Sequence, residues 1–299
     1  MLLCGCMLRH KPVAPEPPRG PTRDSLFRFD QARSDSAARS TDGALATFAP
    51  NAAYLRAGAP TIYGRDAAAR IIKATDIDAG AIMWEPLGGG VSSDLQSGYT
   101  YGIAARTQTE KAAAMRFGRY IAYWERSRGV PWRIVAYVEV GSPTVPASVE
   151  IPEAVRTPPA EPSLPKLLAD ARSSLRSADS SFSDLSYRMG TGYAFSNTVA
   201  EDGVVFGAPD LRVGPRAIRE GFALQTESSS LTWKPEFVAI AGSRDIGYTI
   251  GEYVSTGRGP SGAAVQRFGK YLTIWRHQKD GHWLFVADGG NPSPTPPQK

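Results

Sequence analysis

The chain has only two cysteines among its 299 residues, Cys4 and Cys6, and both lie at the N-terminal end. Because no cysteine follows, disulfide bonds cannot hold a globular part together, and a cysteine nucleophile within it is excluded. A pair separated by one residue is also a poor metal site without partners elsewhere. We therefore predict no bound metal ion.

Several other features are missing. No stretch approaches the roughly 20 apolar residues that a membrane-spanning helix needs. The net charge of +5 arises from 34 basic and 29 acidic residues without a run of Lys and Arg, which argues against a nucleic-acid partner. No dinucleotide, phosphate-loop, nucleophilic-serine or zinc-protease motif occurs, so we expect no cofactor.

The sequence does contain an internal repeat. The stretch "RFGRYIAYWER" that begins at Arg116 recurs as "RFGKYLTIWRH" from Arg267, and "SGYTYG" recurs as "IGYTIG". The tripeptide "WEP" at Trp84 recurs as "WKP" at Trp233. The landmarks keep their order, which indicates tandem duplication of a unit of about 120 residues, a normal domain size.

Proline marks the boundaries of the two units. Seven prolines between Ser142 and Pro165 exclude a regular helix or central strand and favour a semi-extended linker. We expect five segments: a disordered N-terminal tether (1–23), a first domain (24–141), the Pro-rich linker (142–163), a second domain (164–290) and a disordered tail (291–299).

The N-terminal "LCGC" resembles a bacterial lipobox, with Cys6 as the lipid-modified residue and the prolines behind it as a tether. Only five residues precede Cys6, fewer than a secretory signal needs, so this interpretation expects the natural start to lie upstream. The sequence leaves two locations open: the cell envelope, through a lipid anchor in the membrane, or the cytoplasm, with the cysteines in an unmodified tail.

Each unit begins with helical patterns and ends with four strand patterns, which predicts an α+β fold. In the first unit we expect a short helix that stops near Pro50. In the second we expect helices near Pro165–Ser181 and Tyr187–Phe195.

The strand patterns are apolar on both faces. In "RYIAYWE", Tyr120, Ala122 and Trp124 point one way, and Ile121 and Tyr123 point the other. A half-solvated antiparallel sheet would alternate apolar and polar residues. One face therefore covers the helices and the other meets a second apolar surface, for which the sister unit is the simplest candidate. We predict an intrachain pseudo-dimer, joined sheet to sheet.

The motif order, with "W.P", "GYT.G" and "G.W....D.G", resembles the SnoaL-like branch of the nuclear transport factor 2-like superfamily, and most of all its members with a domain of unknown function. The resemblance implies two cystatin-like cones, in which a curved antiparallel sheet wraps a long helix and leaves an apolar pocket at its open end. This superfold hosts cyclases, isomerases, dehydratases and binding domains, so it specifies no activity.

Two residues of the second unit are candidates for acid–base chemistry. Asp288 would have a raised pKa if it pointed into an apolar cone, and the alternative is a strand-end turn in "DGG". The first unit has Tyr137 at this position. His277 could act near neutral pH or lie solvated beside a turn, and the first unit has Arg126 there.

Aromatic residues that recur in both units are candidates for ligand contacts, with core packing as the alternative. They are Tyr248, Tyr271, Trp233, Trp275, Tyr99, Tyr120, Trp84 and Trp124. No acidic residue is shared at aligned positions of the strand segments, which argues against two equal active sites. The sequence favours a protein that binds a small, mostly apolar molecule, rather than an enzyme. A cofactor-free isomerase, cyclase or hydrolase-type enzyme using the second unit and a non-catalytic scaffold are the alternatives.

Overall fold

The computed structural model describes residues 23–37, 41–75, 82–107, 115–142, 165–206, 211–223, 230–259 and 261–297. The expected tether up to residue 22, which includes Cys6, and nearly all of the Pro-rich linker lie outside these residues. Arg23, the last residue of the expected tether, is the first residue of a helix. The lipid anchor and the linker conformation stay predictions.

The two units repeat one order of elements. The first unit contains α1 (Arg23–Ala37), α2 (Thr41–Leu45), β1 (Phe48–Leu55), β2 (Ile62–Tyr63), α3 (Arg65–Thr75), β3 (Ile82–Val91), β4 (Ser97–Thr107), β5 (Met115–Glu125) and β6 (Arg133–Ser142). The second contains α4 (Pro165–Met189), α5 (Thr191–Thr198), β7 (Val199–Phe206), β8 (Leu211–Val213), α6 (Gly214–Ala223), β9 (Ser230–Ile240), β10 (Ile246–Arg258), β11 (Ala264–His277) and β12 (Trp283–Pro292). The predicted α+β class is confirmed, and we call the units domain one and domain two.

Each domain has one six-stranded sheet, with the orders β2-β1-β6-β5-β4-β3 and β8-β7-β12-β11-β10-β9. The four late strands are antiparallel, as predicted, but β1 pairs with β6 and β7 pairs with β12 in parallel. Each sheet is therefore mixed, with one parallel pair beside the antiparallel strands. The chain leaves β1, passes through one helix and four further strands, and returns beside β1 in the same direction. Parallel pairing requires a long connection of this kind.

Two helix ends differ from the predictions. Helix α4 continues to Met189, and Gly190, with φ of 88°, separates it from α5 because glycine adopts this conformation without strain. Pro50 lies inside β1 rather than at a helix end. It sits where the β1–β6 register is interrupted, between Phe48 and Ala53, and an interrupted ladder tolerates a residue without an N–H group.

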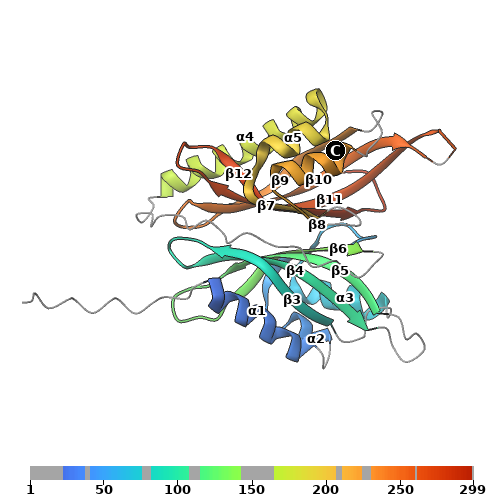
Figure 1. The fold of residues 1–299 in the computed structure, drawn as a ribbon. Helices are drawn as coiled ribbons and strands as arrows, with labels where there is room; N and C mark the ends of the chain where they lie inside the picture. Colours follow the sequence, from blue (N-terminus) through green and yellow to red (C-terminus); the bar gives the residue numbers. More distant parts are fainter. Residues whose placement is uncertain are drawn as a thin grey trace, which may run out of the picture.

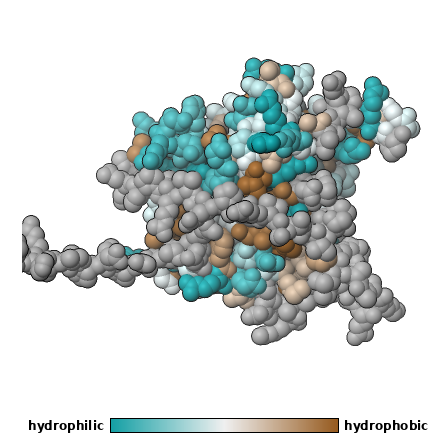
Figure 2. Space-filling model, viewed as in Figure 1, coloured by the Kyte–Doolittle hydropathy of each residue, from teal (hydrophilic) through white to brown (hydrophobic). Residues whose placement is uncertain are grey.

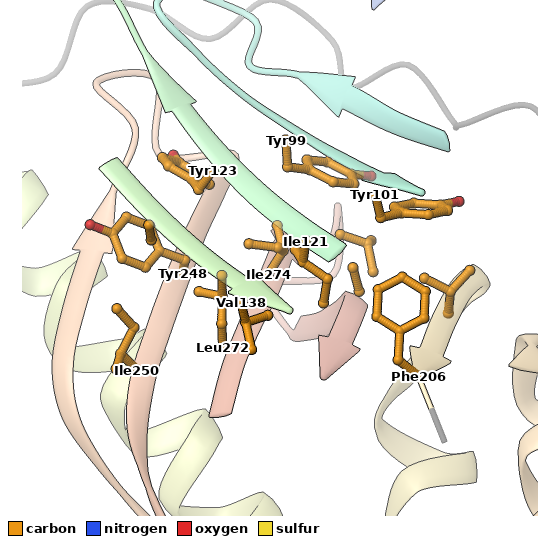
Figure 3. Packing of buried hydrophobic residues seen from close by; sticks show 14 of the residues in the cluster. Tyr99, Tyr101, Ile121, Tyr123, Val138, Phe206, Tyr248, Ile250, Leu272 and Ile274 are labelled. Atoms are coloured by element: carbon orange, nitrogen blue, oxygen red, sulfur yellow. The ribbon is translucent and has the colours of Figure 1, made fainter. Parts of the chain in front are cut away.

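The two sheets face each other, and the helices lie on the outer faces (Figure 1). One apolar cluster spans both domains, with Ile121, Tyr123 and Val138 from domain one against Leu272 and Ile274 from domain two. Figure 3 shows these side chains converging between the strands of the two domains. The predicted sheet-to-sheet pseudo-dimer is confirmed, as is the alternation of residues along β5.

Aromatic contacts cross the same seam. The rings of Tyr123 and Tyr248 have centroids 4.5 Å apart, and those of Tyr101 and Phe206 are 6.1 Å apart. Apolar residues lie at the seam between the domains in Figure 2, whereas polar residues dominate the outer side of the upper domain.

No helix in the described part of the chain is long and apolar enough to cross a membrane.

Hydrogen bonds between the domains repeat with approximate two-fold symmetry. The Ser93 amide donates to Asp245 Oδ2 at 2.7 Å, and the Ser243 amide donates to Asp94 Oδ2 at 2.8 Å. Each pair joins the β3–β4 turn to the β9–β10 turn. Asn291 Nδ2 also donates to the carbonyl oxygens of Leu55 and Glu139 in domain one, so the last strand of domain two is tied to its partner sheet.

The repeated second glycine of "GYT.G" has a structural reason. A Cβ atom at Gly102 would lie 2.0 Å from the Glu85 carbonyl oxygen, and one at Gly251 would lie 2.0 Å from that of Lys234. Real Cβ atoms do not approach a backbone oxygen so closely. The glycines allow the bulged edge strand of each sheet to pack against its neighbour.

Leu272→Ala tests the seam, because Leu272 is fully buried there. We expect the variant to lose about 2–5 kcal/mol of unfolding free energy, the usual cost of a core Leu→Ala cavity. Urea denaturation measures the loss, and Lys279→Ala in the exposed β11–β12 turn is the control. A loss as small as that of the control would contradict the buried seam.

Candidate functional site

Each domain holds one carboxyl group from its long helix inside its cone. Asp30 on α1 and Asp179 on α4 are both fully buried. In each domain the first tyrosine of the repeated β5 or β11 motif donates to this carboxyl: Tyr120 to Asp30 at 2.5 Å, and Tyr271 to Asp179 at 2.9 Å. The two aspartates therefore occupy equivalent positions in the repeat.

In domain one the buried carboxylate is paired with a cation from its own helix. Arg33 Nε donates to Asp30 Oδ1 at 2.5 Å, and the guanidinium carbon lies 3.6 Å from the centre of the Trp84 ring. Burial by itself would lower the pKa of Arg33, but the Asp30 carboxylate outweighs this effect and the pKa is raised. The ion pair and the aromatic face together satisfy a charge that would otherwise be costly to bury.

The rest of the domain-one cone is filled by aromatic rings. Tyr137 stacks on Tyr54, with centroids 5.4 Å apart, and on Tyr120, at 5.9 Å. Phe48 meets both Tyr54 and Tyr137, and the Trp84 indole donates to the Tyr137 hydroxyl at 2.9 Å. All these side chains are buried. Domain one therefore fills this part of its cone with buried side chains, and the Tyr137 hydroxyl donates at 3.4 Å to Oε2 of the partly exposed Glu139.

Domain two replaces the residues that fill the cone of domain one. Phe182, three residues after Asp179, stands where domain one has Arg33. In the sheet of domain one, Tyr137 on β6 lies opposite Tyr54 on β1. In the sheet of domain two, the equivalent neighbours are Asp288 on β12 and Val205 on β7. Two tyrosine rings are thus replaced by an aspartate and a valine. Asp288 is partly exposed, unlike Tyr137, which is buried.

Asp288 points to the same side of the sheet as the other cone residues. It pairs in register with Thr273 on β11, whose hydroxyl donates to Asp288 Oδ2 at 2.6 Å. The neighbouring Ala287 belongs to the seam, as does Leu272 beside Thr273. Because side chains alternate along a strand, Asp288 and Thr273 face the cone together with Tyr271.

The two acids of domain two have raised pKa values. Burial raises the pKa of Asp288 to about 7, partly offset by the hydrogen bond from Thr273 and increased further by Asp179. Burial also raises the pKa of Asp179, although Thr249, Trp233 and Tyr271 stabilise its charged form through hydrogen bonds. The Trp233 indole donates to Asp179 Oδ1 at 2.6 Å. The cone thus places two carboxyl groups in a poorly solvated site, and one of them belongs to a partly exposed residue.

The predicted aromatic residues divide into two groups. Six face the cones: Trp84, Trp124 and Tyr120 in domain one, and Trp233, Trp275 and Tyr271 in domain two. Tyr99 and Tyr248 face the seam between the domains instead. The indoles of Trp124 and Trp275 donate to Thr100 and Thr249 at 2.8 Å and 2.9 Å, an equivalent contact in each core. Of the six, Trp233 is only partly buried and lies beside the acid pair.

The structure does not bring His277 and Asp288 together. The His277 ring lies tilted against the Trp283 ring at the β11–β12 turn, with centroids 4.7 Å apart. Its Nε2 lies 3.1 Å from the Gly281 carbonyl oxygen. Its register partner is Trp283, whereas that of Asp288 is Thr273, four residues along β11. Four strand residues span about 13 Å, so an acid–base pair of these two residues is not assembled.

The alignment of the two repeats in the sequence did not identify these helix residues. It compared acidic residues only in the strand segments, whereas the acids common to both domains lie on α1 and α4. The available signal was an aspartate four residues after a buried leucine in both first helices, Leu26 with Asp30 and Leu175 with Asp179. Residues at this spacing lie on one helix face, so each aspartate had to point inward with its leucine.

Among the described residues, no group of three or more His, Cys, Asp or Glu side chains could hold a metal ion. No protein-family model matches the chain. No curated protein matches it either.

Several solved structures are similar to one domain of the chain. An NTF2-like protein with a cystatin-like fold from Novosphingobium aromaticivorans is 21% identical over 42% of this chain and 84% of its own, with a TM-score of 0.35. A ketosteroid isomerase-like protein from Erwinia carotovora atroseptica is 17% identical over 44% and 100%, with a TM-score of 0.36. A protein from Catenulispora acidiphila, solved in complex with S-DNPA, is 15% identical over 42% and 94%, with a TM-score of 0.34.

The raised pKa of Asp288 predicts a pH-dependent stability. The folded protein keeps the Asp288 proton up to about pH 7, whereas the unfolded chain releases it near pH 4. Stability is therefore expected to fall as pH rises through this window. The side-chain amide introduced by Asp288→Asn cannot ionise, so at pH 8 the variant should be more stable than the wild type by up to about 4 kcal/mol, at about 1.4 kcal/mol per pKa unit.

Urea denaturation at pH 5 and pH 8 measures this difference. Asp184→Asn is the matched control, because Asp184 lies on the exposed side of the same helix as Asp179. Parallel stability profiles for the wild type and Asp288→Asn would contradict an Asp288 that titrates with a raised pKa.

Proposed function

We propose that the protein binds a small, mostly apolar molecule in the cone of domain two, and that domain one is the structural partner that covers the other face of its sheet. The observation that supports a site in domain two is that Asp288 is partly exposed among buried neighbours, whereas domain one has the buried Tyr137 at this position. An apolar site with few polar groups is the usual form of a small-molecule site.

The walls of domain two support an apolar ligand. Phe182 meets Phe195, Trp233 and Phe285 at centroid distances of 4.7, 4.5 and 5.5 Å, so one end of the cone is closed by packed rings. Thr273, Asp179 and Asp288 lie on the remaining side. A bound molecule would thus rest its apolar part on aromatic side chains and direct one polar group to the carboxyls.

Binding of the neutral dye N-phenyl-1-naphthylamine tests this proposal. We expect saturable, one-to-one binding with a rise in dye fluorescence. In Asp288→Tyr, which introduces the ring that domain one carries at Tyr137, the affinity should fall at least about tenfold, or 1.4 kcal/mol, because the ring takes the ligand's space.

Lys279→Tyr adds the same ring to the exposed turn and is the control. Circular dichroism establishes that each variant is folded. If Asp288→Tyr does not fold, Val205→Tyr introduces the ring of Tyr54 at the paired position. No binding by the wild type, or equal binding by a folded variant with the added ring, would overturn the proposal.

Proton transfer is a second candidate function, favoured by the pKa of about 7 for Asp288. A carboxyl group that titrates near neutral pH can act as a general acid or base. For any compound that the protein converts with Asp288 as the base, the rate should rise with pH through about 7. Asp288→Asn should lower that rate by about 100- to 10,000-fold. A pH-independent rate, or full activity of the variant, would exclude this role.

A further inference from the structure

The two domains differ in how they balance charge inside the cone. In domain one the helix carboxylate, Asp30, lies 2.5 Å from the guanidinium of Arg33. In domain two the equivalent helix positions carry Asp179 and Phe182, and the sheet adds a second acid, Asp288. The helix cation is thus replaced by a phenyl ring, and a carboxyl group takes the place of the Tyr137 ring.

Three of the four aromatic rings around the cation in domain one recur in domain two, where Asp288 replaces the fourth, Tyr137. The guanidinium of Arg33 lies over Trp84 and near the rings of Tyr120 and Trp124. Domain two has Trp233, Tyr271 and Trp275 at the equivalent positions. Domain one therefore displays, with its own side chain, a charged group that one aspartate, two tyrosines and two tryptophans accommodate, and domain two keeps all of these residue types except the second tyrosine.

Arg33 behaves like a bound guanidinium. It is almost fully buried, and its two terminal nitrogens have no hydrogen-bond partner among the described residues. Its charge is stabilised by Asp30 and by the ring faces, rather than by a network of acceptors. A ligand with a compact planar cation could use the same chemistry.

We propose that the molecule bound by domain two carries an organic cation, an amidinium, guanidinium or ammonium group, which pairs with Asp288 and Asp179. This inference rests on the proposed function and names its ligand class. Phe182 covers the Trp233 end of the cone, 4.5 Å away. The cation therefore lies toward Asp288, where the ring of Tyr137 has no counterpart.

The groups that face Asp288 are compatible with a positively charged ligand. They are Asp179 from α4 and Thr273 and Tyr271 from β11, with Val205 beside it on β7. Arg176 acts electrostatically on Asp179, but its guanidinium donates to the carbonyl oxygens of Pro235 and Glu236 on β9, at 2.7 and 3.3 Å. A cation close to Asp288 would allow both carboxyls to ionise without repulsion.

Three probes of one shape but different charge test the proposal: benzamidine (cationic), benzamide (neutral) and benzoate (anionic). At pH 8 we expect calorimetry to show benzamidine binding at least about tenfold more tightly than benzamide, the usual gain from a charge-assisted hydrogen bond, with benzoate weakest. At pH 5, where Asp288 is protonated, the preference for benzamidine should largely disappear.

Two variants locate the effect. Asp288→Asn should remove the preference for benzamidine while benzamide binding stays within about threefold. Phe182→Arg supplies domain two with the internal cation of domain one and should abolish benzamidine binding. Asp184→Asn removes one charge from the exposed side of the same helix and should leave all three affinities unchanged.

The outcomes separate the two proposals. If the neutral dye binds but benzamidine shows no advantage over benzamide in the wild type, the cation inference is overturned and the proposed binding function stands. A preference that survives in Asp288→Asn also overturns the inference. If neither the dye nor any probe binds the folded wild type, the proposed function itself fails.

Discussion

The apolar seam between the two sheets is the contact on which the rest of this molecule depends. Both faces of each sheet are apolar, since one face covers the domain's own helices and the other covers the sister domain. Fully burying a large aliphatic side chain contributes about 1.5–3 kcal/mol, so exposing the seam would cost many such contributions at once. Neither domain can present its seam face to water and keep this gain.

The seam also explains why the duplicated halves could diverge. Packing against the partner constrains Ile121, Val138, Leu272 and Ile274, all fully buried. It places no such demand on the inside of each cone. Domain one closes its cone with Arg33 and stacked tyrosines, whereas domain two keeps a partly exposed Asp288. One half can thus supply rigidity while the other carries a site.

Burying two carboxyl groups near each other is unfavourable unless they are protonated or paired with a cation. Domain two holds Asp179 with three neutral donors and Asp288 with one hydroxyl. Such an arrangement contributes little to stability above neutral pH. Buried carboxyl groups that lower the unfolding free energy in this way are typical of functional sites. There, a bound ligand or the transfer of a proton can offset the unfavourable burial of charge.

The sequence alone determined the duplication, the α+β class and the pairing of the two sheets. All three follow from the spacing of the repeated motifs and from the alternation of side chains along each strand. Both are local properties, so that neighbouring residues such as Tyr120 and Ile121 point to opposite faces of the sheet whatever the rest of the fold is. It also singled out Asp288, as an acid whose pKa would rise if its side chain pointed into an apolar cone. Only the tertiary structure decided what surrounds that carboxyl. Asp179 comes from a helix more than a hundred residues away, Tyr248 turns to the seam while Tyr271 turns to the cone, and His277 lies at the far end of its strand. These relations depend on how the helix crosses the sheet, which no local pattern contains.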